Sequence, residues 1–417
     1  MGIKRIVRQG AQEISQQLKS NKTLIILCIE VTIMMMGIGL VSPILPQYAR
    51  TFGVNMTLIG MLITIFGIAR MIVDIPAGRL TDKVGRRPVL IIGPLILAIG
   101  SIGCGLAQNY WLFLSFRFIQ GIGSAMYTTA AMVMLADIST EDNRGKLMSF
   151  YQGCILLGAG LGPTMGGFLA QYFGLRVPFF AFAALAISAS IWAYFSLPES
   201  RPEKIYKQSK NQEVLLDSHQ KAIKNLLRDP NFLLISLITF GVFITRQGAQ
   251  NQILPLLSAD RLGLNEGQIG FALTIVAVIQ LVTIFISGRL SDRIGRKAVI
   301  TPGAIIIAIS LIMLSYTNSY SFLIFTCLIM GIGIGTCGPI SSAYVADIIP
   351  KESYSVGMGT YRAISDLGFV IGPVLLGWLC DVKNFDFALL CNSVFLFGVV
   401  LLFQFKAEES HCVSWKV

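Results

Sequence analysis

The sequence predicts an all-α membrane protein with twelve transmembrane helices in two pseudo-symmetric six-helix bundles. Composition, twelve long apolar spans and an internal repeat carry this prediction. Of the 417 residues, 54% are hydrophobic and 13% are charged, whereas soluble domains carry about 25% charged residues. A soluble protein of this composition would expose more apolar surface than water tolerates. We therefore expect a lipid bilayer to surround it.

Twelve stretches are long and apolar enough to cross a bilayer, which takes about 20 mainly apolar residues. Glycine and proline inside them do not argue against helix, since membrane helices tolerate both. The first half holds the spans 24–48, 57–79, 89–107, 111–136, 147–172 and 177–197. The second half holds the spans 232–257, 267–289, 298–316, 320–346, 354–379 and 385–405.

The second half repeats the first at an offset of 210 residues. Residues 78–90 read GRLTDKVGRRPVL, and residues 288–300 read GRLSDRIGRKAVI. LADI at 135–138 likewise returns as VADI at 345–348. Matches at one fixed offset indicate an internal duplication. Because each copy holds six spans, both copies enter the membrane in the same orientation, as in transporters whose halves rock around a central site.

The predicted organisation has five segments. They are a cytoplasmic N-terminal segment (1–23), an N-terminal bundle (24–197), a polar cytoplasmic linker (198–230), a C-terminal bundle (231–405) and a cytoplasmic tail (406–417). Of the 33 Lys and Arg residues, 25 lie on the side of the termini and four lie in the loops on the other side. Cytoplasmic loops carry such an excess, so we expect cytoplasmic termini.

The net charge of +11 would suggest nucleic acid in a soluble protein. Its one-sided distribution instead indicates membrane orientation and contact with anionic lipid headgroups, so we expect no nucleic-acid partner. The sequence contains no phosphate-binding loop, nucleophile triad or metal cluster, so we expect no enzyme, cofactor or metal site. The eight cysteines form no C-x-x-C pair and are expected to be small buried apolar residues. We expect a monomer in the cell (inner) membrane.

Four motifs resemble those of the major facilitator superfamily. Residues 78–90 look like its signature loop between helices 2 and 3, and RFIQGIGSA (117–125) resembles the helix-4 motif of proton-coupled members. LGAGLGPTMGG (157–167) resembles the helix-5 motif of antiporters, and GIGLVSPILPQYA (37–49) the helix-1 ending of twelve-span drug:proton antiporters. The resemblance covers about residues 24–405. It implies a secondary transporter that works by alternating access and exports small amphipathic compounds in exchange for protons.

Other functions stay open. The chain could be a symporter or facilitator of an organic anion or sugar-like nutrient, or an exporter of a lipid-like metabolite. Four arginines against three carboxylates inside the spans favour the organic anion. A receptor or scaffold built on a transporter fold is a further alternative. If the chain is a transporter, we expect its partners to be a small-molecule substrate, protons and membrane lipids.

The repeated loop is the candidate gate. Gly78 and Gly288 would let another helix approach closely, and Asp82 is expected just past the end of its helix. The resemblance implies that this loop latches the two halves together on the cytoplasmic side. The candidate latch consists of Gly78, Asp82, Arg86 and Arg87 in the first copy and Gly288, Asp292 and Arg296 in the second. The alternative is that these charges only set the membrane orientation.

The fifth span carries a second gating candidate, formed by Gly158, Gly162 and Pro163. Small residues at this spacing permit tight helix contact, and proline adds a bend. The resemblance implies a hinge-like face where the halves meet. Ordinary helix packing is the alternative.

Seven ionisable residues lie inside the spans, where they are costly and therefore candidates for function. They are Glu30, Arg70, Asp74, Arg117, Arg246, Arg362 and Asp366. Their counterparts at the 210-residue offset are all uncharged, namely Phe240, Gln280, Ile284, Cys327, Met36, Gln152 and Leu156. The duplicated framework therefore lacks duplicated charges, which suggests a role in moving the cargo or the proton.

Glu30 is the first proton-coupling candidate, and its depth suggests that it lies near Arg70 and Asp74. A structural ion pair between Glu30 and Arg70 is the alternative, and Asp74 is a rival. Arg117 matches the arginine of the helix-4 motif, so the resemblance implies a part in proton coupling. A purely structural hydrogen-bonding role for Arg117 stays open.

The polar segment TRQGAQNQ (245–252) sits within the seventh span and is expected to line the substrate cavity. The cavity candidates are Arg246, Gln247, Gln250, Asn251 and, from the helix-4 motif, Gln120. Hydrogen bonds between helices are the alternative for the amides. Arg70, Arg362 and Asp366 are ion-pair candidates, with Asp366 pairing with Arg362 or Arg246.

Overall fold

The computed structural model describes residues 22–140, 143–200, 223–224, 226–350 and 353–410. Twelve of its helices are long and apolar enough to cross a membrane, and the described residues contain no strand. The predicted fold class is therefore confirmed. Most of the N-terminal segment, much of the linker and most of the tail lie outside the described residues.

The helices follow one another through short turns in each half. The first half contains α2 (Lys22–Val41), α3 (Leu45–Arg50), α4 (Met56–Val84), α5 (Arg86–Leu106), α6 (Tyr110–Asp137), α7 (Arg144–Phe173) and α8 (Val177–Ser196). The second half contains α10 (Pro230–Ile244), the π-helix η1 (Thr245–Ile253), α11 (Leu254–Leu262), α12 (Glu266–Ile294), α13 (Arg296–Ser315), α14 (Tyr320–Ile348), α15 (Tyr354–Val382) and α16 (Phe385–Lys406).

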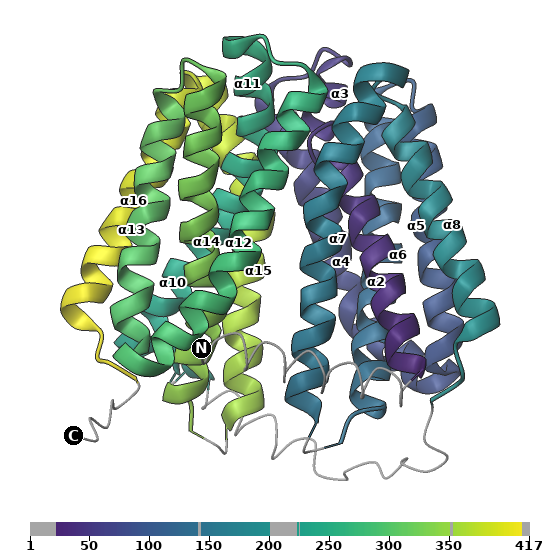
Figure 1. The fold of residues 1–417 in the computed structure, drawn as a ribbon, viewed down its shortest axis with the longest axis horizontal. Helices are drawn as coiled ribbons and strands as arrows, with labels where there is room; N and C mark the ends of the chain where they lie inside the picture. The colour runs from purple at the N-terminus through teal and green to yellow at the C-terminus, as the bar shows by residue number, and fades with distance from the viewer. Residues whose placement is uncertain (1–21, 141–142, 201–222, 225, 351–352, 411–417) are drawn as a thin grey trace, which may run out of the picture.

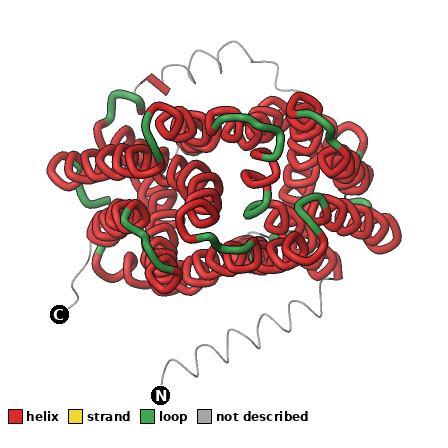
Figure 2. Tube along the Cα trace, turned by 90° about the horizontal axis from the view of Figure 1, so that it is seen from above, coloured by secondary structure: helices red, strands yellow, loops and turns green. Residues whose placement is uncertain are grey.

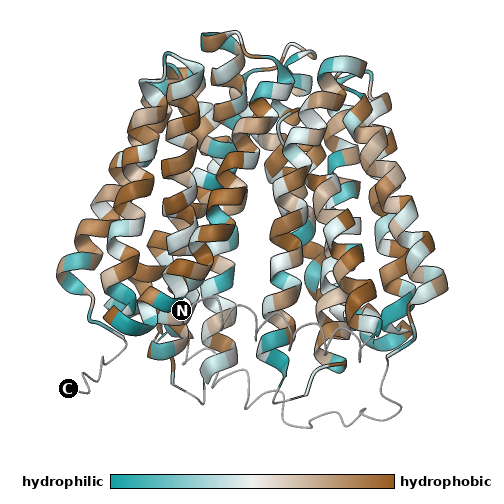
Figure 3. Ribbon diagram, in the orientation of Figure 1, coloured by the Kyte–Doolittle hydropathy of each residue, from teal (hydrophilic) through white to brown (hydrophobic). Residues whose placement is uncertain are grey.

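Two bundles of helices stand side by side (Figures 1 and 2). Buried apolar side chains form one core mainly within α2–α8, which Leu256 of α11 joins, and another within α10–α16. Large apolar side chains such as Phe195, Phe285 and Phe405 remain exposed, and hydrophobic residues dominate the long helices (Figure 3). This surface suits a lipid environment.

Two pairs of long helices make the most extensive contacts between the bundles, α4 with α15 and α7 with α12. At the first crossing, a Cβ added to Gly60 would overlap the carbonyl of Pro373. At the second crossing, a Cβ on Gly270 would overlap the carbonyl of Pro163. Gly60 and Gly270 are 210 residues apart, as are Pro163 and Pro373, so the duplication has produced two equivalent contacts between the bundles.

The bundles meet on the side opposite the termini, called here the opposite side, and diverge toward the terminal side (Figure 1). Arg50 pairs with Asp260 across the bundles. The backbone amide of Thr57 donates to Asp381 at 2.8 Å. Among the described residues, the hydrogen bonds and ion pairs that join the bundles all lie in this half of the molecule. The structure is therefore closed on the opposite side.

Candidate functional site

Glu30 of α2 lies inside the first bundle with none of its surface exposed. Neither of its carboxylate oxygens has a hydrogen-bond partner among the described residues. Tyr127 of α6 and Tyr151 of α7 are close enough to interact with it electrostatically. The structural ion pair with Arg70 is therefore wrong for this conformation, because Glu30 faces its own bundle and not α4.

Four charged residues instead gather where α4 meets α15. Arg70 of α4 interacts electrostatically with Asp74, Asp366 and Arg362. Asp366 of α15 interacts with Arg362, Arg70 and Asp74. We call these four residues the charged quartet. Sequence depth alone placed Arg70 and Asp74 beside Glu30, whereas helix packing places them beside α15.

Arg117 of α6 is held by neutral groups. Its Nε donates to the carbonyl of Leu62 at 3.1 Å and its guanidinium to Gln120 Oε1 at 2.8 Å, and it lies over the ring of Phe66. Gln120 in turn donates to Ser101 at 2.5 Å and is fully buried. Gln120 is therefore not a cavity residue in this conformation, contrary to expectation. The contacts of Arg117 agree with the alternative in which it has a purely structural, hydrogen-bonding role.

The polar segment of the seventh span is a π-helix, η1, which the sequence did not predict. Such segments are rare and frequently occur at functional sites. Asn251 accepts a hydrogen bond from Ser42 of the first bundle at 3.3 Å and donates to Gln247 at 3.0 Å. Thr245 accepts from Asn392 of α16. The segment is thus anchored to its own bundle and also reaches the other one.

The remaining η1 residues divide into paired and unpaired groups. Gln252 donates to the carbonyl of Met56 at 2.8 Å across the bundles. Gln250 is buried, and its carbonyl oxygen has no partner among the described residues. Arg246 is half-buried and has no hydrogen bond or ion pair with any described residue. The predicted pair between Arg246 and Asp366 is therefore absent from the described structure.

The first copy of the repeated motif forms a network within its own bundle. Arg86 pairs with Asp137 at 2.8 Å and with Asp82 at 3.3 Å. Glu199 accepts hydrogen bonds from the backbone amides of Arg86 and Arg87 at the start of α5. A carboxylate at a helix N-terminus is favourable because the amides there are unpaired.

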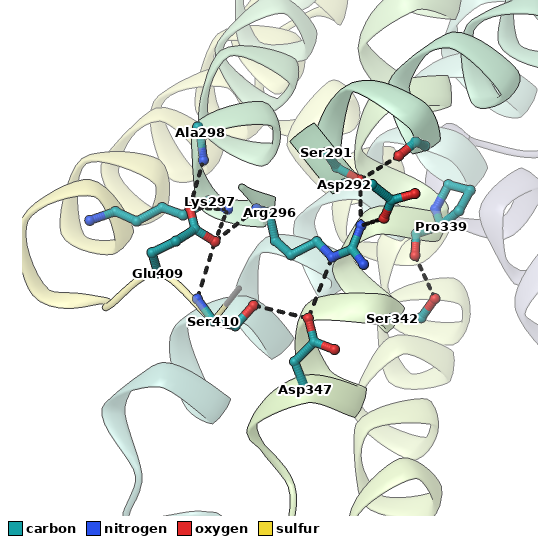
Figure 4. Close-up of polar contacts among 11 residues, drawn as sticks. Ser291, Asp292, Arg296, Lys297, Ala298, Pro339, Ser342, Asp347, Glu409 and Ser410 are labelled. Atoms are coloured by element: carbon teal, nitrogen blue, oxygen red, sulfur yellow. Dashed lines mark hydrogen bonds and ion pairs between the residues drawn. The ribbon is translucent and has the colours of Figure 1, made fainter. Parts of the chain in front are cut away.

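The second copy forms the same network (Figure 4). Arg296 contacts Asp347 at 3.4 Å and pairs with Asp292, and its backbone amide donates to Glu409 at 2.7 Å. Glu199 and Glu409 are 210 residues apart, and each is followed by serine. The 210-residue offset identifies this pair in the sequence, although neither glutamate is among the residues predicted above.

The motif differs from expectation in two respects. Asp82 lies inside α4, which continues to Val84, so the loop shrinks to Gly85. Gly85 has φ +112°, a conformation that favours glycine. Among the described residues, no other helix approaches closely at Gly78 or Gly288, where an added Cβ would find a single atom at 3.8 Å or none within 4 Å. The predicted latch contact is therefore not formed in this conformation.

The glycines of α7 serve two interfaces. A Cβ on Gly158 or Gly162 would overlap α2 of the same bundle, at the carbonyls of Thr32 and Met36. Pro163 instead meets Gly270 of α12 across the bundles. Gly158 and Gly162 therefore provide packing within the bundle, and Pro163 provides the contact between bundles.

Comparisons with known proteins agree with this architecture. The chain is 27% identical to Multidrug resistance protein 2 of Bacillus subtilis (strain 168) over 96% of this chain and 99% of that protein. It is 25% identical to Quinolone resistance protein NorA of Staphylococcus aureus over 94% and 98% of the two chains.

Solved structures share the fold at lower identity. An inward-facing bacterial homolog of the human lysosomal transporter Spinster aligns with a TM-score of 0.76 at 16% identity, over 91% of this chain and 95% of that one. A D-xylose-proton symporter aligns with a TM-score of 0.73 at 18% identity, over 93% and 99%. The Major Facilitator Superfamily model matches residues 27–265 and 242–411. The chain is therefore an integral membrane transporter that belongs to the Major Facilitator Superfamily.

Proposed function

We propose that this transporter exports small amphipathic compounds in exchange for protons, with its terminal side in the cytoplasm of a cell whose inner membrane holds it. The observation that carries the proposal is Glu30, a fully buried carboxyl group without a hydrogen-bond partner among the described residues. Multidrug resistance proteins among the relatives support the direction and the substrate type.

Glu30 suits proton exchange because its two charge states differ strongly in free energy. An isolated carboxylate is costly inside a protein, so the neutral acid is favoured while the site is closed. The hydroxyls of Tyr127 and Tyr151 interact with it electrostatically but form no hydrogen bond with it among the described residues. Opening the site to water would stabilise the carboxylate and release the proton.

The arrangement of the bundles supports alternating access. The structure is closed on the opposite side by pairs such as Arg50 with Asp260. In the reverse conformation, the networks of Arg86 and Arg296 would latch the terminal side, with Gly78 and Gly288 admitting the neighbouring helices. The η1 segment, which reaches both bundles, would form part of the substrate path.

The test is transport of a fluorescent amphipathic dye by purified protein in liposomes with and without an imposed pH gradient. We expect gradient-driven dye transport by the wild type, and a loss of at least about tenfold in Glu30→Gln, since one proton site is removed. Dye counterflow without a gradient should persist in this variant. Asp74→Asn tests the rival carboxylate, and Asp386→Asn, in the first turn of α16 on the opposite side, is the control.

Full gradient-driven transport by Glu30→Gln would overturn the role of Glu30. Wild-type transport that ignores the gradient would overturn proton coupling itself. Loss in Asp74→Asn alone would assign coupling to the rival carboxylate.

A further inference from the structure

Arg246 differs from the other three arginines inside the spans. Arg117 donates hydrogen bonds to Leu62 and Gln120. Arg70 and Arg362 share the charged quartet with two aspartates. Within the described part of the chain, Arg246 alone among the four has neither a hydrogen bond nor a charged neighbour.

An unpaired guanidinium is costly at this depth. Arg246 lies in the middle of the seventh span, Pro230–Leu262. Arg246 is half-buried, so its guanidinium has lost part of its hydration. A cation that has lost hydration inside a protein is normally paired with a negative group. The guanidinium cannot avoid the cost by losing its proton. Its persistence is therefore better explained by a negative partner that arrives during the transport cycle.

The described residues offer no free carboxylate near Arg246. Asp366, the partner considered from the sequence, interacts with Arg362 and Arg70. Glu30 lies inside the other bundle beside Tyr127. No described residue therefore supplies the negative partner, and a bound ligand is the candidate.

The surroundings of Arg246 suit a polar ligand. The π-helical turns of η1 begin at Thr245 and interrupt the regular α-helix at this point. Gln250, four residues after Arg246, is 8% exposed, and its carbonyl oxygen has no partner. An unsatisfied buried amide in the same short helix as an unpaired cation indicates an incomplete polar site.

We propose that Arg246 binds the acidic group of the substrate, so that the exported compound is an amphipathic anion bearing a carboxylate, sulfonate or phosphate. A planar guanidinium matches such groups with two parallel hydrogen bonds. This inference rests on the proposed function, because it takes η1 as part of the substrate path. It adds the chemical class of the substrate.

The test is equilibrium binding of three matched probes to the purified full-length protein in detergent, measured by fluorescence anisotropy. Pyrenebutyrate is the anion, pyrenebutyramide is its neutral analogue, and pyrenylbutyl-trimethylammonium is the cation. We expect the wild type to bind the anion about tenfold or more tightly than the amide, as charge-assisted hydrogen bonds imply. The cation should bind no better than the amide.

Substitutions test whether Arg246 is the source of the preference for the anionic probe. Arg246→Gln should bind the anion and the amide equally. Arg246→Lys should keep part of the preference, since it retains the charge without the planar fork. Arg261→Gln is the matched control, because it removes an arginine of the same half that already pairs with Asp386. It should bind like the wild type.

A competition arm identifies the source of the anion. Displacement of pyrenebutyrate by phosphatidylglycerol, but not by phosphatidylcholine, would identify a lipid headgroup. Retention of the probe would identify a soluble organic anion. Both outcomes support recognition of an anion by Arg246.

Equal wild-type affinities for the three probes, or no binding of any of them, would overturn the proposal. So would an anion preference that survives in Arg246→Gln. If Arg246→Gln does not fold, the wild-type probe series and Arg246→Lys still decide. The assay uses no proton gradient, so a failure of proton coupling at Glu30 would leave its result intact.

Discussion

The α4–α15 and α7–α12 contacts between the bundles share one geometry but differ in charge. At both crossings, a glycine of one helix meets a proline carbonyl of the other, at Gly60 with Pro373 and at Gly270 with Pro163. The α4–α15 contact also carries the charged quartet. The equivalent positions between α7 and α12 hold Gln280, Ile284, Gln152 and Leu156.

This difference separates two tasks that share one scaffold. The close glycine contacts allow the bundles to rest against each other and are therefore needed twice. Charges at a contact between two moving bundles make the energy of that contact depend on how the two helices are aligned. This is because electrostatic attraction changes with the distance between the charges. We infer that the α4–α15 contact sets the relative stability of the conformations, whereas the α7–α12 contact supplies packing.

The largest expected effect comes from filling the glycine contacts. Gly60→Ala and Gly270→Ala should each reduce dye transport by about tenfold or more, because overpacking costs about 1–3 kcal/mol and a backbone carbonyl cannot move aside cheaply. Transport in liposomes is the measurement. Gly359→Ala, where an added Cβ would meet nothing within 4 Å, is the control. Sensitivity of only one glycine would show that the two contacts are not mechanically equivalent.

The charged quartet should give the next largest effect. Asp366→Asn leaves Arg70 and Arg362 with one carboxylate, and we expect it to lower stability by about 1–2 kcal/mol, allowing for partial exposure. The double variant Arg362→Gln/Asp366→Asn restores charge balance and should recover at least half of this loss. Thermal unfolding in detergent measures both.

The equivalent position in the other contact supplies the control for this comparison. Leu156→Asn introduces the same amide between α7 and α12, where no quartet exists. Combining it with Gln152→Leu should not restore any lost thermal stability, because neither substitution leaves an unbalanced charge. Equal destabilisation of the single and double variants at Asp366 would contradict the quartet.

The sequence predicted the fold well because its evidence is local and periodic. Apolar length identified the spans, and the 210-residue offset identified equivalent elements. It failed where the answer depends on which helices become neighbours. Depth placed Glu30 near Arg70, but α2 packs against α7 and α8 while α4 packs against α6 and α15.

Two local features also escaped the sequence. TRQGAQNQ has no pattern that distinguishes a π-helix from an α-helix, so η1 could not be foreseen. The helix end at Asp82 was placed too early because charged residues suggested a loop, whereas α4 extends past the apolar span to Val84. The cap formed by Glu199 was recoverable, since Glu409 repeats it at the same offset.

The smallest expected effect concerns the pair at the pseudo-symmetry axis. Arg50 and Asp260 are 210 residues apart and face each other across the bundles, with side chains 36% and 39% exposed. Exposed pairs contribute about 0–1 kcal/mol, so Arg50→Ala should shift the balance between conformations by no more than about fivefold. Spin-label distances across the opposite side report this balance.

Because the two positions are equivalent in the duplicated scaffold, exchanging their charges should restore the contact. Arg50→Asp alone places two carboxylates together and should open the opposite side, while Arg50→Asp/Asp260→Arg should return the distances to those of the wild type. High salt should weaken the single-variant effect, since screening shortens the reach of exposed charges. A swap that stays as open as Arg50→Asp would show that the halves are unequal even at their axis, and the asymmetry of this transporter would then extend beyond the charged quartet.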